Sequence, residues 1–331
     1  MIDYVSLRTN ITIPINYFSS VKWKRSKTED GQYFHWHTVR GVKLRYYEET
    51  QCFTINGKIL MYLYNTQVQN LDDIYGSQKE LFVDEINCAI NKLFPSPILD
   101  IRDFTVTRID YCFNVETPYV EEYIDFLGHA FQMTNSGSRV DYVRENGLYG
   151  SVYVRTASDY RENQNKNYTL NFYNKSDRLW YLQNKRCHVS EADKILANNV
   201  LRLEVQCGYQ MIKRQTKKYG ISNTFGNLFD YRIAYDTISH VYSLVFKGTE
   251  NADFFTYPMA KEKLKGKPKA QAVIRTATSH RIIKPEYTYG RNLAKQMGVY
   301  PYCFLPRERI LTHLKNPMKL LKNKLNTLGV L

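Results

Sequence analysis

The chain has 331 residues, 43% of them hydrophobic and 24% charged, so it can build a folded core and is not a disordered chain. Its formal net charge is +14, and residues 251–331 hold 16 Lys and Arg against 4 Asp and Glu. A basic excess confined to one region is the electrostatic signature of a polyanionic partner. We therefore expect DNA or RNA as the partner, in preference to a membrane surface.

Several function classes are excluded by missing motifs. The six cysteines form no C-x-x-C pair, which argues against a zinc ribbon and against a disulfide framework. There is no G-x-S-x-G and no P-loop, so we expect neither a serine hydrolase nor a helicase of its own. No apolar run approaches the ~18 residues of a membrane span, and no secretory signal opens the sequence. These features predict a cytoplasmic protein, in a bacterial host, without a membrane partner.

The first third of the chain is predicted to be mostly strand. Short β-rich runs predict strands over residues 2–7, 34–39, 42–47, 52–55 and 59–64. Asn56-Gly57 is a dipeptide typical of a hairpin turn. Helical spacing of apolar residues then predicts a helix over 79–93, which Pro95 ends.

The middle of the chain mixes both element types, and the last third is mainly helical. The patterns predict strands over 104–115, 149–156, 168–173 and 200–207, and helices over 120–133, 177–185, 228–246, 291–297 and 307–322. A lysine-rich stretch over 261–269 interrupts the last helices. We expect an α+β fold with two units, residues 1–220 and a basic, mainly helical unit over residues 221–331.

Three of the predicted strands carry ionisable residues on one face of an otherwise apolar run. Residues two apart in a strand share a face, so Arg108 lies beside Asp110, and Arg202 lies beside Glu204. In the strand near residue 170, the polar face is Thr169, Asn171, Tyr173 and Lys175.

Two interpretations of these faces stay open from the pattern alone. Arg108–Asp110 and Arg202–Glu204 could be salt bridges on a solvated sheet. If the three strands are neighbours, however, Asp110 and Glu204 supply hard oxygen ligands for Mg2+ or Mn2+. Tyr173 then supplies a phenol nucleophile, and Lys175 a cation beside it. This is the equipment for attack on a phosphodiester.

The same strands resemble a known family. Arg108-Ile109-Asp110, Phe172-Tyr173-Asn174-Lys175 and Leu201-Arg202-Leu203-Glu204 occur in the order found in the filamentous-phage gene II replication initiators and are similar to the Rep-trans group of plasmid rolling-circle initiators. Lys218-Tyr219-Gly220 followed by Asn227-Leu228-Phe229-Asp230 also looks like the phage proteins, as does the opening Met1-Ile2-Asp3. The resemblance covers about residues 104–231.

The resemblance implies an HUH-endonuclease-like fold with a central antiparallel sheet and helices on one face. It implies nicking of the plus-strand origin, a covalent 5′-phosphotyrosine and later rejoining of the strand. By matching motif, Tyr173 is the nucleophile, Lys175 its neighbouring cation, and Asp110 and Glu204 the metal ligands. Supporting roles fall to Arg108, Arg202 and Asn171.

Other residues compete for these roles. His35 and His37 form a His-x-His pair on a predicted strand and are a second candidate metal site, although they lie far from Tyr173 in the sequence. By residue type, Tyr149, Tyr153, Tyr160 and Tyr168 are alternative nucleophiles.

Origin DNA is the expected partner, single-stranded at the nick and duplex at the binding site. A host helicase and polymerase are expected as well, and a dimer is one expected assembly. The expected DNA contacts are Lys213, Arg214, Lys217, Lys218, Lys261, Lys263, Lys265, Lys267 and Lys269. Two alternatives remain: a non-catalytic origin or operator binder, and an RNA-binding protein that stacks bases on its 28 tyrosines.

Overall fold

A computed structural model describes residues 2–39, 41–58, 77–93, 99–124, 126–127, 140–145, 149–155, 168–246, 252–278, 288–300, 304–305, 314–327 and 329. Its centre is a ten-stranded sheet in which every neighbouring pair is antiparallel. In spatial order the strands are β2 (Lys24–Lys27), β3 (Tyr33–Val39), β4 (Val42–Tyr47), β5 (Cys52–Gly57), β1 (Ile2–Asn10), β6 (Thr105–Glu116), β10 (Val200–Cys207), β9 (Tyr168–Asn174), β8 (Tyr149–Arg155) and β7 (Val140–Glu145).

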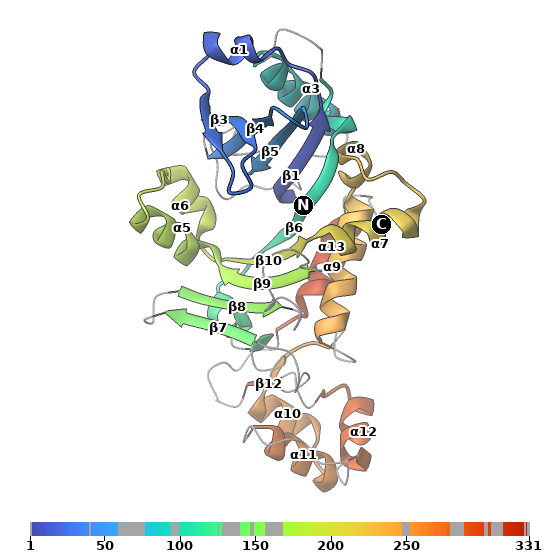
Figure 1. Ribbon diagram of the computed structural model, residues 1–331. Helices are drawn as coiled ribbons and strands as arrows, with labels where there is room; N and C mark the ends of the chain where they lie inside the picture. The colour runs from blue at the N-terminus through green and yellow to red at the C-terminus, as the bar shows by residue number, and fades with distance from the viewer. Residues whose placement is uncertain are drawn as a thin grey trace.

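Helices precede, connect and follow these strands (Figure 1). They are α1 (Ile15–Ser20), α3 (Ser77–Asn91), the 3-10 turn η2 (Ile101–Asp103), α5 (Lys175–Asn184), α6 (Glu191–Ala197), α7 (Tyr209–Tyr219), α8 (Phe225–Leu228), α9 (Tyr231–Val245), α10 (Tyr257–Lys263), α11 (Pro268–Thr278), α12 (Thr288–Gln296) and α13 (Pro317–Thr327). A short parallel pair, β11 (Phe255–Thr256) and β12 (Phe304–Leu305), lies among the last helices. The predicted α+β class with a central antiparallel sheet is confirmed.

One face of the sheet is apolar and carries the core. Strand alternation places Leu7, Ile109 and Leu203 on this face, and all three are buried. Helix α9 packs against β6, β9 and β10, while α7 packs against β6 and β10. Helices α7 and α9 thus cover the apolar face, as predicted, and polar residues occupy the other face of the central strands. Helix α5 also contacts β8, β9 and β10, but its buried Leu179 packs with Ala197 in a cluster separate from the core.

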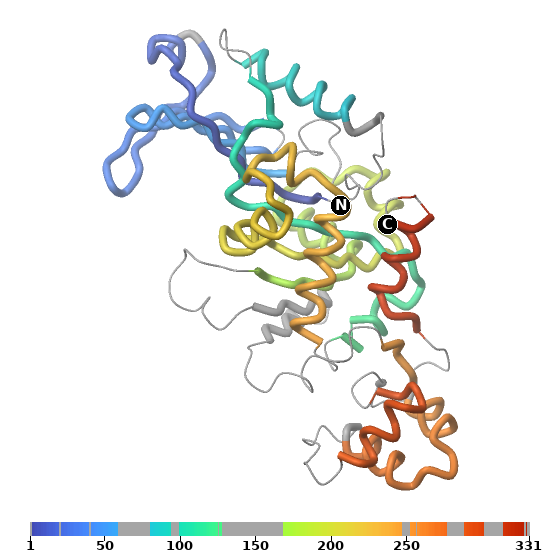
Figure 2. The backbone as a smooth tube through the Cα atoms, turned by 90° about the vertical axis from the view of Figure 1, so that its right-hand side faces the viewer, coloured from blue at the N-terminus to red at the C-terminus, as the bar shows by residue number. Residues whose placement is uncertain are grey.

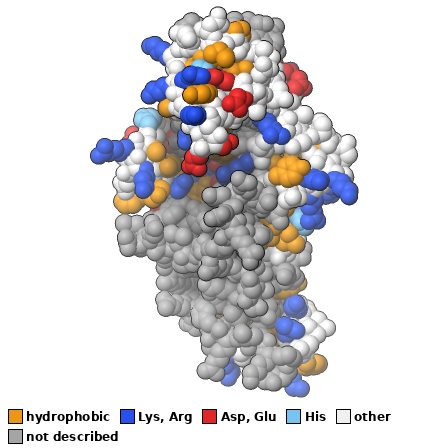
Figure 3. Space-filling view, in the orientation of Figure 1, with side chains coloured by type: hydrophobic (Ala, Val, Ile, Leu, Met, Phe, Trp, Pro, Cys, Tyr) orange, Lys and Arg blue, Asp and Glu red, His pale blue; other side chains and the backbone are white. Residues whose placement is uncertain are grey.

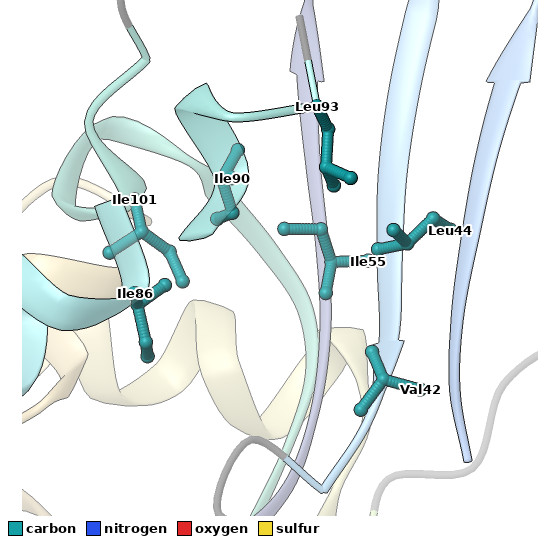
Figure 4. A pocket seen from close by; sticks show the side chains of 7 residues that line it. All are labelled: Val42, Leu44, Ile55, Ile86, Ile90, Leu93 and Ile101. Carbon is teal, nitrogen blue, oxygen red and sulfur yellow. The ribbon is translucent and has the colours of Figure 1, made fainter. Parts of the chain in front are cut away.

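Helix α3 packs on the same apolar face further along the sheet and leaves a small cavity beneath it (Figure 4). The cavity measures about 20 Å³ and is lined by Val42, Leu44, Ile55, Ile86, Ile90, Leu93 and Ile101. It could hold one water by size, but its lining is entirely hydrocarbon and offers no hydrogen-bond partner. It is therefore a gap in packing, with no connection to the polar face.

The prediction of a hairpin turn at Asn56-Gly57 is wrong. Both residues belong to β5 and pair with β1, where Asn56 lies opposite Ser6 and Gly57 opposite Val5. Glycine is required here for a different reason. A Cβ on Gly57 would lie 2.9 Å from the Cα of Val42 on the neighbouring chain segment, and its φ is +153°. The strand predicted over 59–64 lies outside the described residues.

The predicted unit over 221–331 contains helices α8 to α13 and the β11–β12 pair. Helix α13 packs against β6, and α8, α9 and α13 contribute to the same hydrophobic core as the sheet. Helices α10, α11 and α12 pack on one another at one end of the molecule (Figures 1 and 2), and their buried residues, among them Val273 and Ala294, belong to that same core. Helix α9 presents its amphipathic face to the sheet, where it buries Ile233 and Val241.

Among the described residues, no helix has the length and apolarity that crossing a membrane requires. The five cysteines that the structure describes are all free thiols.

Candidate active site

The three predicted strands with polar faces are direct neighbours in the sheet. Strand β10 pairs with β6 on one side and with β9 on the other. In register, Gln206 of β10 lies opposite Asp110, and Glu204 lies opposite Asn171. Residues opposite each other in an antiparallel pair project to the same face. Asp110 and Glu204 therefore share a face of adjacent strands, as predicted, and Tyr173 shares it with them.

Glu204 is the centre of a buried hydrogen-bond network on this face. The Tyr173 hydroxyl donates to Glu204 Oε2 over 3.0 Å. Asn171 Nδ2 donates to Oε1 over 3.3 Å, and Gln206 Nε2 donates to the same oxygen over 2.9 Å. Tyr173 and Glu204 are only 5% and 6% exposed. A phenol and a carboxylate are thus held together out of bulk water, and a proton can pass between them.

Asp110 is also buried but takes a different partner. Arg108 forms a bidentate pair with it, with Nε to Oδ1 at 2.8 Å and Nη2 to Oδ2 at 2.6 Å. Burial raises the pKa of Asp110 to about 7, and the negative charge of Glu204 adds to this against the opposing effect of Arg108. The salt-bridge interpretation thus holds for Arg108–Asp110, yet the negative charge of Glu204 still disfavours the ionised form of Asp110.

The alternative salt bridge between Arg202 and Glu204 is not among the interactions that the structure shows for these residues. The fully buried Arg202 instead donates Nη1 to Asp3 Oδ1 over 2.5 Å and Nε to Asn114 Oδ1 over 2.9 Å. Lys58 Nζ lies 2.9 Å from the other Asp3 oxygen. Burial alone would raise the pKa of Asp3, but Lys58 and Arg202 hold it well below its usual value. This second ionic group borders Tyr173, which lies opposite Arg202 in register.

The sequence prediction missed Asp3, Lys58, Asn114 and Gln206 as members of the polar face. Asp3 and Arg202 are 199 positions apart, so no local pattern joins them. The available signal was the run Arg202-Leu203-Glu204-Val205-Gln206, where three polar residues alternate with apolar ones, and the polar Asp3 within an apolar strand.

Lys175 occupies a different element from the predicted one. Strand β9 ends at Asn174, whose side chain accepts a hydrogen bond from the Ser176 amide, and Lys175 is the first residue of α5. Its ammonium still lies 5.8 Å from the centre of the Tyr173 ring. Burial lowers the pKa of Lys175 well below its usual value, and the charges of Arg202 and Lys58 act in the same direction.

Tyr173 is a neutral phenol in this environment. Burial raises its pKa well above 10, and the neighbouring Glu204 charge raises it further. The cation that the sequence predicts beside Tyr173, Lys175, would by itself favour the phenolate. Desolvation and Glu204 outweigh the cations, so attack by this oxygen needs a base. Glu204, which accepts the phenolic hydrogen bond, is the group placed to act as one.

The donor set on this face suits a hard divalent cation in composition. Asp110, Glu204 and the amide oxygen of Asn171 are oxygen donors, and Asn171 Oδ1 is buried without a hydrogen-bond partner. The mutual effect of two carboxylates on the Asp110 pKa would be relieved by a positive ion. Within the described parts of the chain, however, no group of three or more His, Cys, Asp or Glu could hold a metal. A cation here would depend on Asn171, waters or phosphate oxygens for its remaining ligands.

The His-x-His pair lies elsewhere. His37 pairs with Leu44 of β4, and Leu44 with Ile55 of β5, so strand register places His35 and His37 on the apolar side of the sheet. His35 Nε2 lies 2.8 Å from Glu48 Oε1, and its ring stacks on Phe18 at 4.1 Å. These two histidines and Asp110 cannot ligate one metal, because the sheet separates them.

The alternative tyrosines are only partly described. Tyr168 is half-buried at the start of β9. Tyr149 and Tyr153 lie on β8, where Tyr153 pairs with Asn171, while Tyr160 lies outside the described residues.

All nine predicted DNA contacts are exposed. Lys213, Arg214, Lys217 and Lys218 lie on α7, where Lys218 pairs with Asp236 at 2.5 Å. The five lysines from Lys261 to Lys269 lie on α10, on the turn after it and at the start of α11. The lysine-rich stretch is therefore part of a helical cluster.

No protein-family model matches the chain, and a search of curated proteins finds no match. Among solved structures, the chain is similar to the structure of a rolling circle replication initiator protein from Geobacillus stearothermophilus. The match covers 92% of this chain and 98% of that chain, with 8% sequence identity and a TM-score of 0.34.

Proposed function

We propose that this protein is a metal-dependent DNA strand-transferase that initiates rolling-circle replication by nicking and later rejoining one strand of an origin. The observation that carries the proposal is the buried hydrogen bond from Tyr173 to Glu204, on the same sheet face as Asp110. The resemblance of the strands around these residues to phage and plasmid initiators supports the same chemistry. The chain's positive charge supports a nucleic-acid substrate.

In the proposed reaction, Glu204 takes the phenolic proton as the Tyr173 oxygen attacks phosphorus. The bond from phosphorus to the 3′ oxygen breaks, and that oxygen takes a proton from water and leaves as a 3′-hydroxyl. The product is a 5′-phosphotyrosine that conserves the energy of the broken bond, so the strand can be rejoined without ATP. Lys175, 5.8 Å from the Tyr173 ring, would donate a hydrogen bond to the phosphate, and the negative charge of a bound phosphate would favour its protonated form against the effect of burial.

Asp110, Glu204 and Asn171 would hold Mg2+ or Mn2+, in keeping with their oxygen donors. A divalent cation in this position would polarise the scissile phosphate. Arg108 keeps the Asp110 carboxylate in place. Since Tyr173 is 5% exposed, the polar face must open before a DNA strand can reach the hydroxyl.

Tyr173→Phe tests the proposal. The variant removes one oxygen, so fold and duplex binding should stay nearly unchanged, while nicking and the covalent adduct should fall below detection. The measurement is incubation with Mn2+ and a single-stranded candidate origin oligonucleotide, followed by denaturing electrophoresis. Tyr168→Phe, on the same strand, is the matched control and should keep activity. An adduct that persists in Tyr173→Phe would move the nucleophile to another tyrosine.

A non-catalytic DNA-binding protein is the second candidate. The burial of Tyr173 and its raised pKa favour this alternative, because both suit a structural phenol. It predicts that the wild-type chain binds duplex DNA with no adduct under any metal condition, so the same experiment decides between the two functions.

A further inference from the structure

Helices α5 and α6 project from the sheet beside the candidate active site and carry a surface that the proposed chemistry does not use (Figure 1). Trp180 of α5 is 48% exposed. It borders a groove of about 450 Å³ lined by Ser176, Asp177, Leu179, Trp180, Gln183 and Lys194. This volume lies in the range of small-molecule sites, which is ~300–1,000 Å³. An aromatic face is thus presented inside a recess that admits a planar ring.

The groove begins next to the active site. Ser176, Trp180 and Gln183 follow helical spacing and form one face of α5, and Lys194 of α6 lies across from them. The residue before Ser176 is Lys175, whose ammonium lies over the Tyr173 ring. Trp180 is five residues beyond Lys175, about 7.5 Å along the helix axis. A single strand at the candidate active site can therefore reach the groove with a nucleotide close to the scissile phosphate.

The charge of this segment suits a polyanion. Residues 175–186 hold four Lys and Arg against one Asp. Arg178 and Lys185 both lie near the Tyr181 ring, at 5.3 and 5.4 Å from its centre. In Figure 3, basic and hydrophobic side chains lie next to each other over α5 and α6. Aromatic faces alternating with cations are the pattern by which proteins hold single-stranded nucleic acid.

We infer that the groove along α5 binds an unpaired nucleotide of the single-stranded DNA next to the scissile phosphate, with its base stacked on Trp180. The occupant is a single strand and not a duplex, because a base that is paired and stacked within a duplex has no free face for the indole. Asp177 and Gln183 supply hydrogen-bonding groups to the base edge, and Lys185 and Arg186 are the exposed cations of the segment for the backbone phosphates. This inference rests on the proposed function for the identity of the DNA strand.

The test measures affinity without cleavage. The full-length chain, in EDTA, is titrated against a fluorescent 15-nucleotide oligothymidylate and against a duplex hairpin, and binding is read by anisotropy. Base–aromatic stacking contributes ~1–3 kcal/mol per base, so Trp180→Ala should weaken oligothymidylate binding by about 5- to 150-fold. Duplex affinity should stay within twofold. Trp180→Phe keeps an aromatic face and should retain most of the affinity.

Ile195→Ala is the matched control. Ile195 is a hydrophobic residue on α6, 75% exposed, that does not line the groove, so its truncation should leave both affinities unchanged. Because Trp180 is exposed, its truncation should not lower the melting temperature, which circular dichroism checks.

Three results would overturn the inference. One is unchanged oligothymidylate affinity in Trp180→Ala, and another is an equal loss of single-strand and duplex binding. The third is a change in sedimentation of Trp180→Ala with unchanged DNA binding, which would make the groove a contact between copies of the chain. The outcome is separate from that of the adduct experiment. If Trp180→Ala loses oligothymidylate binding and the wild type forms no adduct, the inference about the groove is supported and the proposed nicking activity is rejected.

Discussion

Asp110 changes its ionisation near neutral pH, because burial raises its pKa to about 7. An acid whose pKa is higher in the folded chain than in the unfolded chain stabilises the fold progressively less as pH rises between the two values. That window runs here from ~4 to about 7. Ionised Asp110 is thus a cost to stability that a divalent cation would offset.

Asp110→Asn should therefore gain stability relative to the wild type as pH rises from 4 to 7, by at most about 4 kcal/mol, with no further change above pH 8. Urea unfolding at several pH values measures the difference. Asp84→Asn, an exposed position on α3, serves as the control and should give a curve parallel to that of the wild type. If the Asp110→Asn curve also runs parallel, the carboxyl is ionised throughout and burial does not raise its pKa.

Asp110→Asn should also abolish the release of a proton on metal binding, because asparagine has no ionisable proton. In the proposed metal site, a cation that binds ionised Asp110 would displace its proton, so affinity for Mn2+ should rise through pH 7 in the wild type. Both carboxylates of the buried face also have partners within the chain. One of them, Glu204, is satisfied by Tyr173 and by amide donors, and the other is held by Arg108 at the rim.

The alternation of polar residues in single strands predicted most of the site, because a period of two is a local property. Asp110, Glu204, Asn171 and Tyr173 were each placed on the polar face from their own strand. The sequence could not place Asp3 and Lys58 on the polar face. Their position there depends on which strands are neighbours and on contacts across the sheet, and no single strand contains that information. The protonation state of Tyr173 depends on its burial and on the Glu204 charge, which residue types in one strand do not reveal.

At the level of elements, α11 and α12 approach each other very closely at Gly290. A Cβ there would lie 2.4 Å from the carbonyl oxygen of Lys269, and its neighbour Tyr289 receives the Lys269 ammonium at 5.1 Å from the ring centre. Backbone cannot move aside as a flexible side chain can. Glycine thus sets the distance between the two helices of the basic cluster.

Gly290→Ala should separate α11 from α12 and destabilise the cluster by ~1–3 kcal/mol, the usual cost of overpacking. Hydrogen exchange should show lower protection in α11 and α12 with unchanged protection in β6, β9 and β10. The control, Asn292→Ala, lies exposed on the same helix and should not lower protection. Equal loss of protection in the sheet would show that the cluster and the sheet unfold as one unit.

Elements were predicted best where one pattern dominated. The strand expected over 200–207 and the helix expected over 177–185 agree closely with β10 and α5. The helix α7 was not predicted. The prediction of a turn at Asn56-Gly57 was wrong because Gly57 lies within β5, where it packs closely against Val42 of another strand. Close packing between elements overrides a local turn preference.

At the scale of the whole molecule, the basic charge and the candidate chemistry lie on separate elements. The polar face belongs to β1, β6, β9 and β10, while residues 257–300, which include α10, α11 and α12, hold ten Lys and Arg against two Glu. This division would let one part hold duplex DNA through its phosphates while another part acts on a single strand. Duplex binding should then be strongly dependent on salt and independent of the active-site tyrosine.

Replacement of Lys261, Lys263, Lys265 and Lys267 by Gln tests the division. Each phosphate that a lysine no longer neutralises should reduce the slope of log K against log salt by ~0.9, so the slope of the quadruple variant should fall by up to about 3.6. Anisotropy titrations of a duplex at several salt concentrations give the slope. All four side chains are exposed, so the fold should be retained. Lys22→Gln with Lys43→Gln is the control and should leave the slope unchanged, because both lysines are exposed outside α7 and the lysine-rich stretch, Lys22 just before β2 and Lys43 on β4. An unchanged slope in the quadruple variant would move the duplex contacts to α7, where the exposed Lys213, Arg214 and Lys217 are the cations to test next.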